Sequence, residues 1–215
     1  MKAKWLSRLL ASRSDATGLD IVLRDALSTW QATAPADDGR SHFESRYVVL
    51  NTESSGLDPE RDRLLSVGAI ALASGTIVAE DSYYADVASD PATALVNLLT
   101  FTGSGPVVVY SAGLNKAMLE RALEKHLGIM PDWIWLDLYW LLPALFPERI
   151  ARPTRLVEWM RSFGIETFQR HHALGDAYAI AQLMLAAEGQ ASRKGLTSPR
   201  SLAELERKQR RFHNR

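Results

Sequence analysis

Three short segments of the chain contain residue types that could act together in binding or catalysis. The first, residues 51–57, includes Asn51 and Glu53, the second includes Asn115, and the third includes His171 and Asp176. Hard divalent cations prefer oxygen ligands, and a histidine side chain gains and loses a proton near neutral pH. Side chains of these types could therefore hold a cation and move a proton. Taken singly, each acid also has an ordinary interpretation, as a surface acid or as an acid at a helix N-terminus.

The predicted elements place the first two segments at one edge of a β-sheet. Residues 47–50 and 106–110 are short, wholly apolar runs, which is typical of buried central strands. The first segment follows one run directly, and the second segment follows the other. Ligands of open sheets gather beyond the carboxyl ends of such strands. The third segment opens a helix that is predicted over residues 173–187.

The remaining pattern predicts an α/β fold with a mixed five-stranded sheet flanked by helices. Strands over residues 64–72 and 76–87 are joined at Ser74-Gly75, which is a hairpin signal. The strands over 106–110 and 133–138 alternate with helices, which implies parallel pairing with the first strand. Helices are predicted over residues 2–13, 19–30, 91–101, 114–127, 139–145, 154–163, 173–187, and from residue 198, with Ser198 as N-cap.

The composition is that of an ordinary globular domain with appendages. The chain has 215 residues, of which 47% are apolar and 23% charged. It contains no cysteine, which excludes a disulfide scaffold, a thiolate zinc site and a cysteine nucleophile. We expect a helical extension and linker over residues 1–45, a main domain over 46–190, and a basic helix or tail over 191–215.

Charge is unevenly distributed although the net charge is zero. Residues 191–215 contain eight Lys and Arg and two acids, a net charge of +6. Such a segment indicates phosphate contact or, as the interpretation we favour on charge alone, a solvated terminal helix. No run of eighteen apolar residues occurs, so no membrane span is expected, and we predict a cytoplasmic protein.

The three segments and their order resemble the DEDDh 3′–5′ exonuclease family. The family includes the proofreading epsilon subunit of DNA polymerase III, ribonuclease T and oligoribonuclease. The motifs here read LNTESSGLDPERDRLLSVGAI, YSAGLNKAML and HHALGD, within residues 46–187, about two thirds of the chain. The resemblance implies a ribonuclease H-like fold. It also implies that the protein acts on or binds nucleotides or the 3′ ends of single-stranded DNA or RNA.

The resemblance also implies a set of site residues and a cofactor. Family members use two Mg²⁺ or Mn²⁺ ions, four carboxylates that hold them, and a histidine that deprotonates the attacking water. By motif position Glu53 and Asp176 correspond to metal ligands, with Glu53 also counted as catalytic, and His171 corresponds to the general base. Thr52 and Leu57 correspond to substrate-binding positions, and Leu57 is expected to pack on the terminal base.

Two of the four acid positions depart from the family pattern. Asn51 and Asn115 stand where the family has aspartate. Asparagine preserves the shape and one oxygen but loses the charge, so the ligand set carries −2 instead of −4. We therefore expect a single weakly bound ion or none. Tyr110, Ser111 and Leu114 also differ from the family's second motif. Such additional differences favour natural divergence over engineered inactivation as the origin of the two asparagines.

The sequence thus predicts an exonuclease-like protein whose activity is impaired or absent. The alternative is a pseudo-exonuclease that serves as a non-catalytic nucleic-acid-binding or protein-binding module, and a homodimer or a protein partner is compatible with both. Of the neighbouring residues, His172 is interpreted as a solvated loop residue and Asp137 as structural. The six tryptophans are interpreted as core or interface residues instead of base-stacking platforms.

Overall fold

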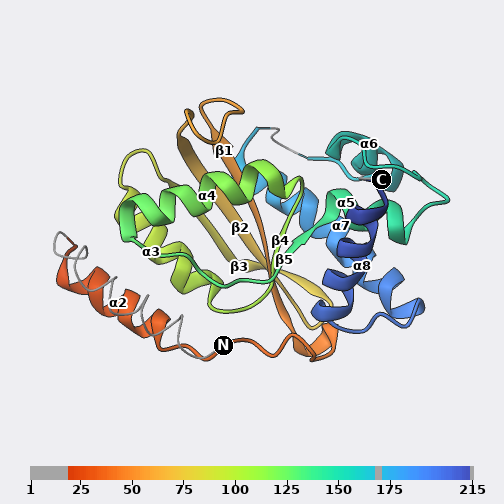
Figure 1. Ribbon diagram of the computed structural model, residues 1–215, viewed down its shortest axis with the longest axis horizontal. Coiled ribbons are helices and arrows are strands. Elements are labelled where there is room, and N and C mark those ends of the chain that lie inside the picture. Colours follow the sequence, from red (N-terminus) through yellow and green to blue (C-terminus); the bar gives the residue numbers. More distant parts are fainter. Residues whose placement is uncertain (1–18, 168–170, 214–215) are drawn as a thin grey trace.

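The computed structural model describes residues 19–167 and 171–213. Its centre is one five-stranded sheet in the order β3-β2-β1-β4-β5 (Figure 1). The strands are β1 (Arg46–Ser54), β2 (Leu64–Ala73), β3 (Thr76–Asp86), β4 (Val107–Val109) and β5 (Trp135–Asp137). The helices are α2 (Ile21–Gln31), the short 3₁₀ helix η2 (His42–Glu44), α3 (Pro91–Thr102), α4 (Ala112–Leu127), α5 (Leu138–Leu145), α6 (Leu156–Phe163), α7 (Ala173–Arg193) and α8 (Pro199–His213).

Strand directions follow the prediction of a mixed sheet. β1 pairs with β2 antiparallel and with β4 parallel, and β4 pairs with β5 parallel. β2 and β3 form the predicted hairpin, in which Ser74 and Gly75 both have positive φ. The central position of β1 brings its carboxyl end beside that of β4, because the two strands run in the same direction.

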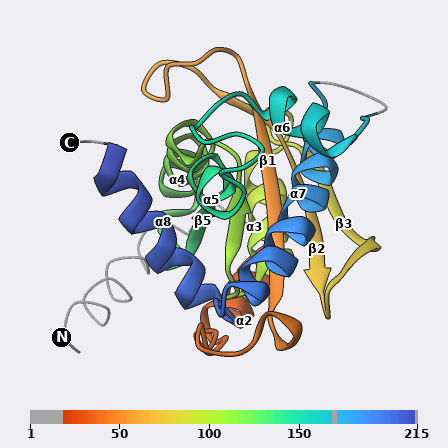
Figure 2. The same ribbon diagram turned by 90° about the vertical axis from the view of Figure 1, so that its right-hand side faces the viewer.

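Helices cover both faces of the sheet, and β1 divides its side chains between them. Tyr47 and Val49 lie in a core with α5, α6, α7 and α8, whereas Val48 and Leu50 lie in a second core with α3 and α4. This alternation is that of a strand buried on both faces. Figure 1 shows α4 in front of the strands and α7 behind them, and Figure 2 shows α8 beside α5 and β5.

Several elements begin or end away from their predicted positions. β5 is shorter than the strand predicted over 133–138 because the Asp137 carboxylate accepts a hydrogen bond from the Tyr139 N–H, which starts α5 at Leu138. α7 continues to Arg193, beyond the predicted end of the main domain at residue 190. The helix predicted over residues 2–13 lies outside the described residues.

The part of the N-terminal extension that is described packs on the main domain. α2 lies against α3, and the Trp30 and Trp133 indole N–H groups both donate to the Gly103 carbonyl, at 3.1 and 2.8 Å. The predicted linker contains η2 and is bonded to α8 through Asp38 and Arg200. No helix among the described residues is long and apolar enough to cross a membrane.

Candidate active site

The carboxyl end of β1 directs two of the candidate residues toward α7. Asn51 and Glu53 continue the side of the strand on which Tyr47 and Val49 lie, because strand side chains alternate with a period of two. The Asn51 side-chain amide donates to Glu53 Oε1 at 3.4 Å, and both side chains are half-buried. They are therefore accessible to a ligand at the edge of the sheet.

Glu53 lies in the electrostatic field of the third segment. Burial raises the pKa of Glu53, and the negative charge of Asp176 raises it further. The charges of His171 and His172 and the hydrogen bond from Asn51 act in the opposite direction. Glu53, Asp176 and both histidines therefore lie close enough to interact. Two repelling carboxylates at one point are a favourable place for a divalent cation.

The third segment rests on β2 and β3 at the start of α7. His172 is the N-cap of α7, and its ring Nδ1 accepts a hydrogen bond from the Gly175 N–H at 3.4 Å. The same ring stacks on Tyr84 of β3, with 4.8 Å between centroids and an angle of 15° between planes. The prediction of His172 as a solvated loop residue is therefore wrong. His171 itself is exposed and has a φ of +60°.

A glycine in β2 permits this close approach. A Cβ at Gly68 would collide with the backbone of Ala173 and Leu174, so the first turn of α7 lies directly on β2 at that point. Gly68 pairs with Tyr84 in the β2–β3 register. Directly paired residues project on the same face, which leaves the Tyr84 ring beside His172. Sequence reasoning missed both residues, because the Gly68–Tyr84 register cannot be read from the local pattern.

Asn115 lies on the other face of β1 and is fully occupied by hydrogen bonds. It is buried, with 6% of its surface exposed, and its Oδ1 accepts from the Thr52 N–H and from the Thr52 hydroxyl, each at 2.9 Å. Its Nδ2 donates to the carbonyls of Tyr110 and Ser111, at 3.0 and 3.4 Å. The structure thus brings Asn51, Glu53 and Asp176 together and holds Asn115 through Thr52.

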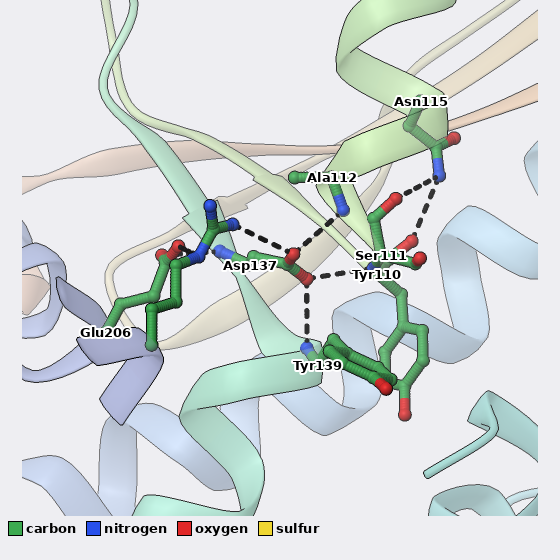
Figure 3. A network of polar contacts seen from close by, with 8 residues as sticks. Tyr110, Ser111, Ala112, Asn115, Asp137, Tyr139 and Glu206 are labelled. Atoms are coloured by element: carbon green, nitrogen blue, oxygen red, sulfur yellow. Dashed lines mark hydrogen bonds and ion pairs between the residues drawn. The ribbon is translucent and has the colours of Figure 1, made fainter. Parts of the chain in front are cut away.

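The start of α4, which carries Asn115, is anchored by Asp137 (Figure 3). The Asp137 carboxylate is buried and accepts hydrogen bonds from the Ser111 and Ala112 N–H groups, both at 2.8 Å. The Glu206 carboxylate of α8 accepts a hydrogen bond from the Asp137 backbone N–H at 2.8 Å, and Arg210 forms ion pairs with the Asp137 and Glu206 carboxylates. Burial raises the pKa of Asp137 and raises that of Glu206 to about 7. The C-terminal helix is therefore joined to the second segment through Asp137.

Leu57 is presented by a braced loop between β1 and β2. Its side chain is 82% exposed. Below it, the Asp62 carboxylate accepts from the Ser55 hydroxyl at 2.8 Å and from the Asp58 N–H at 2.9 Å. Arg121 of α4 donates to the Pro59 carbonyl at 2.5 Å. An exposed leucine on a loop held in this way is suited to contact an apolar ligand surface.

The donor set fits one divalent cation better than two. Among the described residues no group of three His, Cys, Asp or Glu side chains is placed to hold a metal ion. Glu53 and Asp176 supply two carboxylates on the α7 face, with the Asn51 amide beside them. The Asn115 oxygen already accepts two hydrogen bonds, so it has little capacity left for a cation. The described residues therefore offer two carboxylates and one amide here, fewer than the four carboxylates that the family resemblance implies.

Known proteins match both the sequence and the fold, although no protein-family model matches the chain. The DNA polymerase III PolC-type of Thermotoga petrophila is 26% identical over 190 residues, which covers 77% of this chain and 13% of that protein. The oligoribonuclease of Sodalis glossinidius is 32% identical over 96 residues, which covers 42% of this chain and 51% of that protein.

Among solved structures, the zinc-bound complex of E. coli exonuclease I with single-stranded DNA superimposes with a TM-score of 0.55 and 16% identity. The superposition covers 70% of this chain and 42% of that chain. This chain therefore spans about an eighth of the PolC-type relative and under half of the superimposed enzyme.

Proposed function

We propose that this chain, a relative of the 3′–5′ exonucleases in sequence and in fold, binds the 3′ end of a single-stranded nucleic acid at the cluster of Glu53 and Asp176, with catalysis impaired or absent. The observation that carries the proposal is the hydrogen bonding of Asn115. Both polar atoms of its amide are used within the protein. Asn115, at the position of the third carboxylate of a two-metal site, instead joins β1 to the start of α4.

The α7 face of β1 supplies the groups that would act on a bound strand. A divalent cation held by Glu53 and Asp176, Mg²⁺ or Mn²⁺, would supply charge stabilisation for a phosphate oxygen. His171 is exposed beside this cluster and is the group that would accept a proton from water. Leu57, on its braced loop, would contact the terminal base. Thr52, which donates its N–H and its hydroxyl to Asn115, would keep the end of β1 in place beside the bound strand.

Loss of the second cation accounts for weak or absent turnover. Phosphodiester hydrolysis builds negative charge on the attacking and the leaving oxygen, and two cations stabilise both. With one cation, several kcal/mol of that stabilisation are lost, which corresponds to several orders of magnitude in rate. A non-catalytic module that only holds nucleic acid is the second candidate, and the complete bonding of Asn115 favours it. The cytoplasmic location and any protein partner or homodimer stay predictions.

The test compares the natural chain with the variant Asn51→Asp/Asn115→Asp. Single-strand digestion and thermal unfolding are each measured with and without Mn²⁺. We expect the natural chain to bind a single-stranded oligonucleotide and to cut it slowly or not at all. The double variant should gain cutting, and its melting temperature should rise with Mn²⁺ more than that of the natural chain.

Two controls separate the outcomes of this test. Glu53→Ala in the double variant should abolish both the Mn²⁺ effect on melting and any cutting, because it removes a carboxylate from the cluster. If the natural chain binds no single strand at all, the proposed function is wrong. If it binds but the double variant neither binds Mn²⁺ nor cuts, the non-catalytic candidate stands.

A further inference from the structure

A second concave surface lies away from the cluster of Glu53 and Asp176. It is a groove of about 490 Å³ between α4 and α8, above the edge strand β5. We call it the α4–α8 groove. Its wall and floor residues come from four regions of the chain and include Ala112, Gly113, Lys116, Trp135, Arg207 and Arg210.

Basic side chains dominate the accessible wall of the α4–α8 groove. Among the described residues Arg207 has no carboxylate within ion-pair distance, and it is exposed. Lys116 pairs with a partly exposed Glu120 at 3.7 Å, a pairing of little energetic value, and its ammonium also lies over the Trp135 ring. Arg207 and Lys116 are therefore available to a ligand.

Two of the three acids that line the groove are bonded to other groups, and the third, Glu120, is partly exposed beside Lys116. Asp38 is bonded to Arg200 at one end of the groove. Glu206 and Asp137 are buried beneath Arg210. Glu206 accepts a hydrogen bond from the Asp137 N–H, and Asp137 accepts from the Ser111 and Ala112 N–H groups. An anion in the groove would therefore meet the guanidinium and ammonium groups before it meets these carboxylates.

The floor of the groove suits a nucleotide chain as well. The Lys116 ammonium lies 5.6 Å from the centroid of the Trp135 ring, which is part of the floor. Positive charge above an aromatic floor is the arrangement that sequence-independent single-strand binding uses.

The geometry points to a second nucleic-acid contact: we propose that the α4–α8 groove binds the phosphate backbone of a single strand whose 3′ end lies at the cluster of Glu53 and Asp176. Asn115 and Lys116 are neighbours on α4. The first reaches the end of β1, and the second lines the groove. A strand can therefore pass from the cluster around the first turns of α4 into the groove. This inference rests on the proposed function.

The test uses two matched double variants and two lengths of single strand. Lys116→Ala/Arg207→Ala removes the available cations of the groove. Lys125→Ala/Lys208→Ala removes the same charge from the same two helices, at exposed positions outside the lining. Binding of a labelled long oligonucleotide, and of a short one that fills only the cluster, is measured by fluorescence anisotropy across a range of salt concentrations.

On the long strand, Lys116 and Arg207 would make two phosphate contacts, which steepen the fall of log affinity with log salt concentration by about 1.4. Between about 50 and 200 mM salt, the natural chain should therefore lose roughly sevenfold more affinity for the long strand than the groove variant does. The short strand should bind both variants and the natural chain alike. Thermal unfolding checks that both variants are folded.

The outcomes separate the groove from the proposed function. The proposal for the groove is wrong if the two variants affect binding of the long strand equally, or if the groove variant has no effect. The proposed role of the cluster is not affected by either result. If neither strand binds the natural chain, both proposals fail. An equal loss for short and long strands with the groove variant also overturns the groove, because it places both cations at the cluster.

Discussion

The side-chain oxygen of Asn115 accepts two hydrogen bonds from Thr52, one from its N–H and one from its hydroxyl, each 2.9 Å long. The amide nitrogen of Asn115 donates to the Tyr110 and Ser111 carbonyls. The residue thus joins the end of β1 to the turn before α4. It needs a donor and an acceptor on the same side chain, which asparagine has and ionised aspartate lacks.

Asn115→Asp should therefore destabilise the fold when the new acid is ionised. We expect its free energy of unfolding to fall by about 1–3 kcal/mol near neutral pH, because a carboxylate oxygen would face two carbonyls with no proton to donate. Because two carbonyl oxygens would oppose its ionisation, we expect the pKa of such an acid to be raised in the folded state. Its stability contribution is then present at acid pH and is lost as the pH rises through the folded pKa. Urea unfolding at several pH values measures this, and a deficit that does not change with pH would contradict it.

Gly68→Ala should displace the third segment from the sheet. The added methyl group would collide with the backbone of Ala173 and Leu174, so α7 must move or its first turn must open. We expect a loss of about 3 kcal/mol or more in the free energy of unfolding. The matched control is Gly189→Ala inside α7, where a Cβ meets nothing within 4 Å. That change should stabilise by about 0.5–1 kcal/mol. Similar effects of the two changes, measured by chemical denaturation, would show that the contact at Gly68 is unimportant.

Tyr84 should hold His172 by its ring and not by its hydroxyl. Tyr84→Ala is expected to lower the free energy of unfolding by about 0.5–1.5 kcal/mol through the lost ring stacking. Tyr84→Phe keeps the ring and should leave stability within about 0.5 kcal/mol of the natural chain. Imidazole NMR signals of His172 should shift in the alanine variant and stay in place in the phenylalanine variant. Equal shifts in both would assign the effect to the hydroxyl.

Glu188 should make the fold less stable as the solution becomes more basic. Burial raises the pKa of this buried side chain on α7 from 4.5 to about 7. A raised folded-state pKa means that stability is highest below about 4.5 and declines as the pH rises toward about 7. A rise from 4.5 to about 7 corresponds to roughly 3 kcal/mol of stability that is lost at basic pH. Glu188→Gln should remove this decline and raise the melting temperature at basic pH.

The measurement for Glu188 is a set of thermal melts from acid to basic pH. Glu206 has a pKa raised to about 7 by the same cause, so part of the decline should persist in Glu188→Gln. An unchanged pH dependence in the variant would show that Glu188 is not the group responsible.

Local pattern was sufficient for the fold and for the family resemblance. The apolar runs, the Ser74-Gly75 turn and the alternation of strands with helices predicted the mixed five-stranded sheet, which the structure confirms. These signals depend on the spacing of apolar and turn residues within single elements, and that spacing can be read directly from the sequence. The resemblance to 3′–5′ exonucleases, predicted from three ordered motifs, is confirmed by the relatives that match.

Only the tertiary structure decided what individual side chains of the candidate site contact. His172 caps α7 and stacks on the Tyr84 ring, because the pairing of β2 with β3 places Tyr84 beside Gly68. Asn115 meets Thr52, 63 positions earlier in the chain, and Asp137 meets Glu206, 69 positions later. Such partners depend on strand register and on the packing of distant helices, and neither is encoded in the spacing of any one segment.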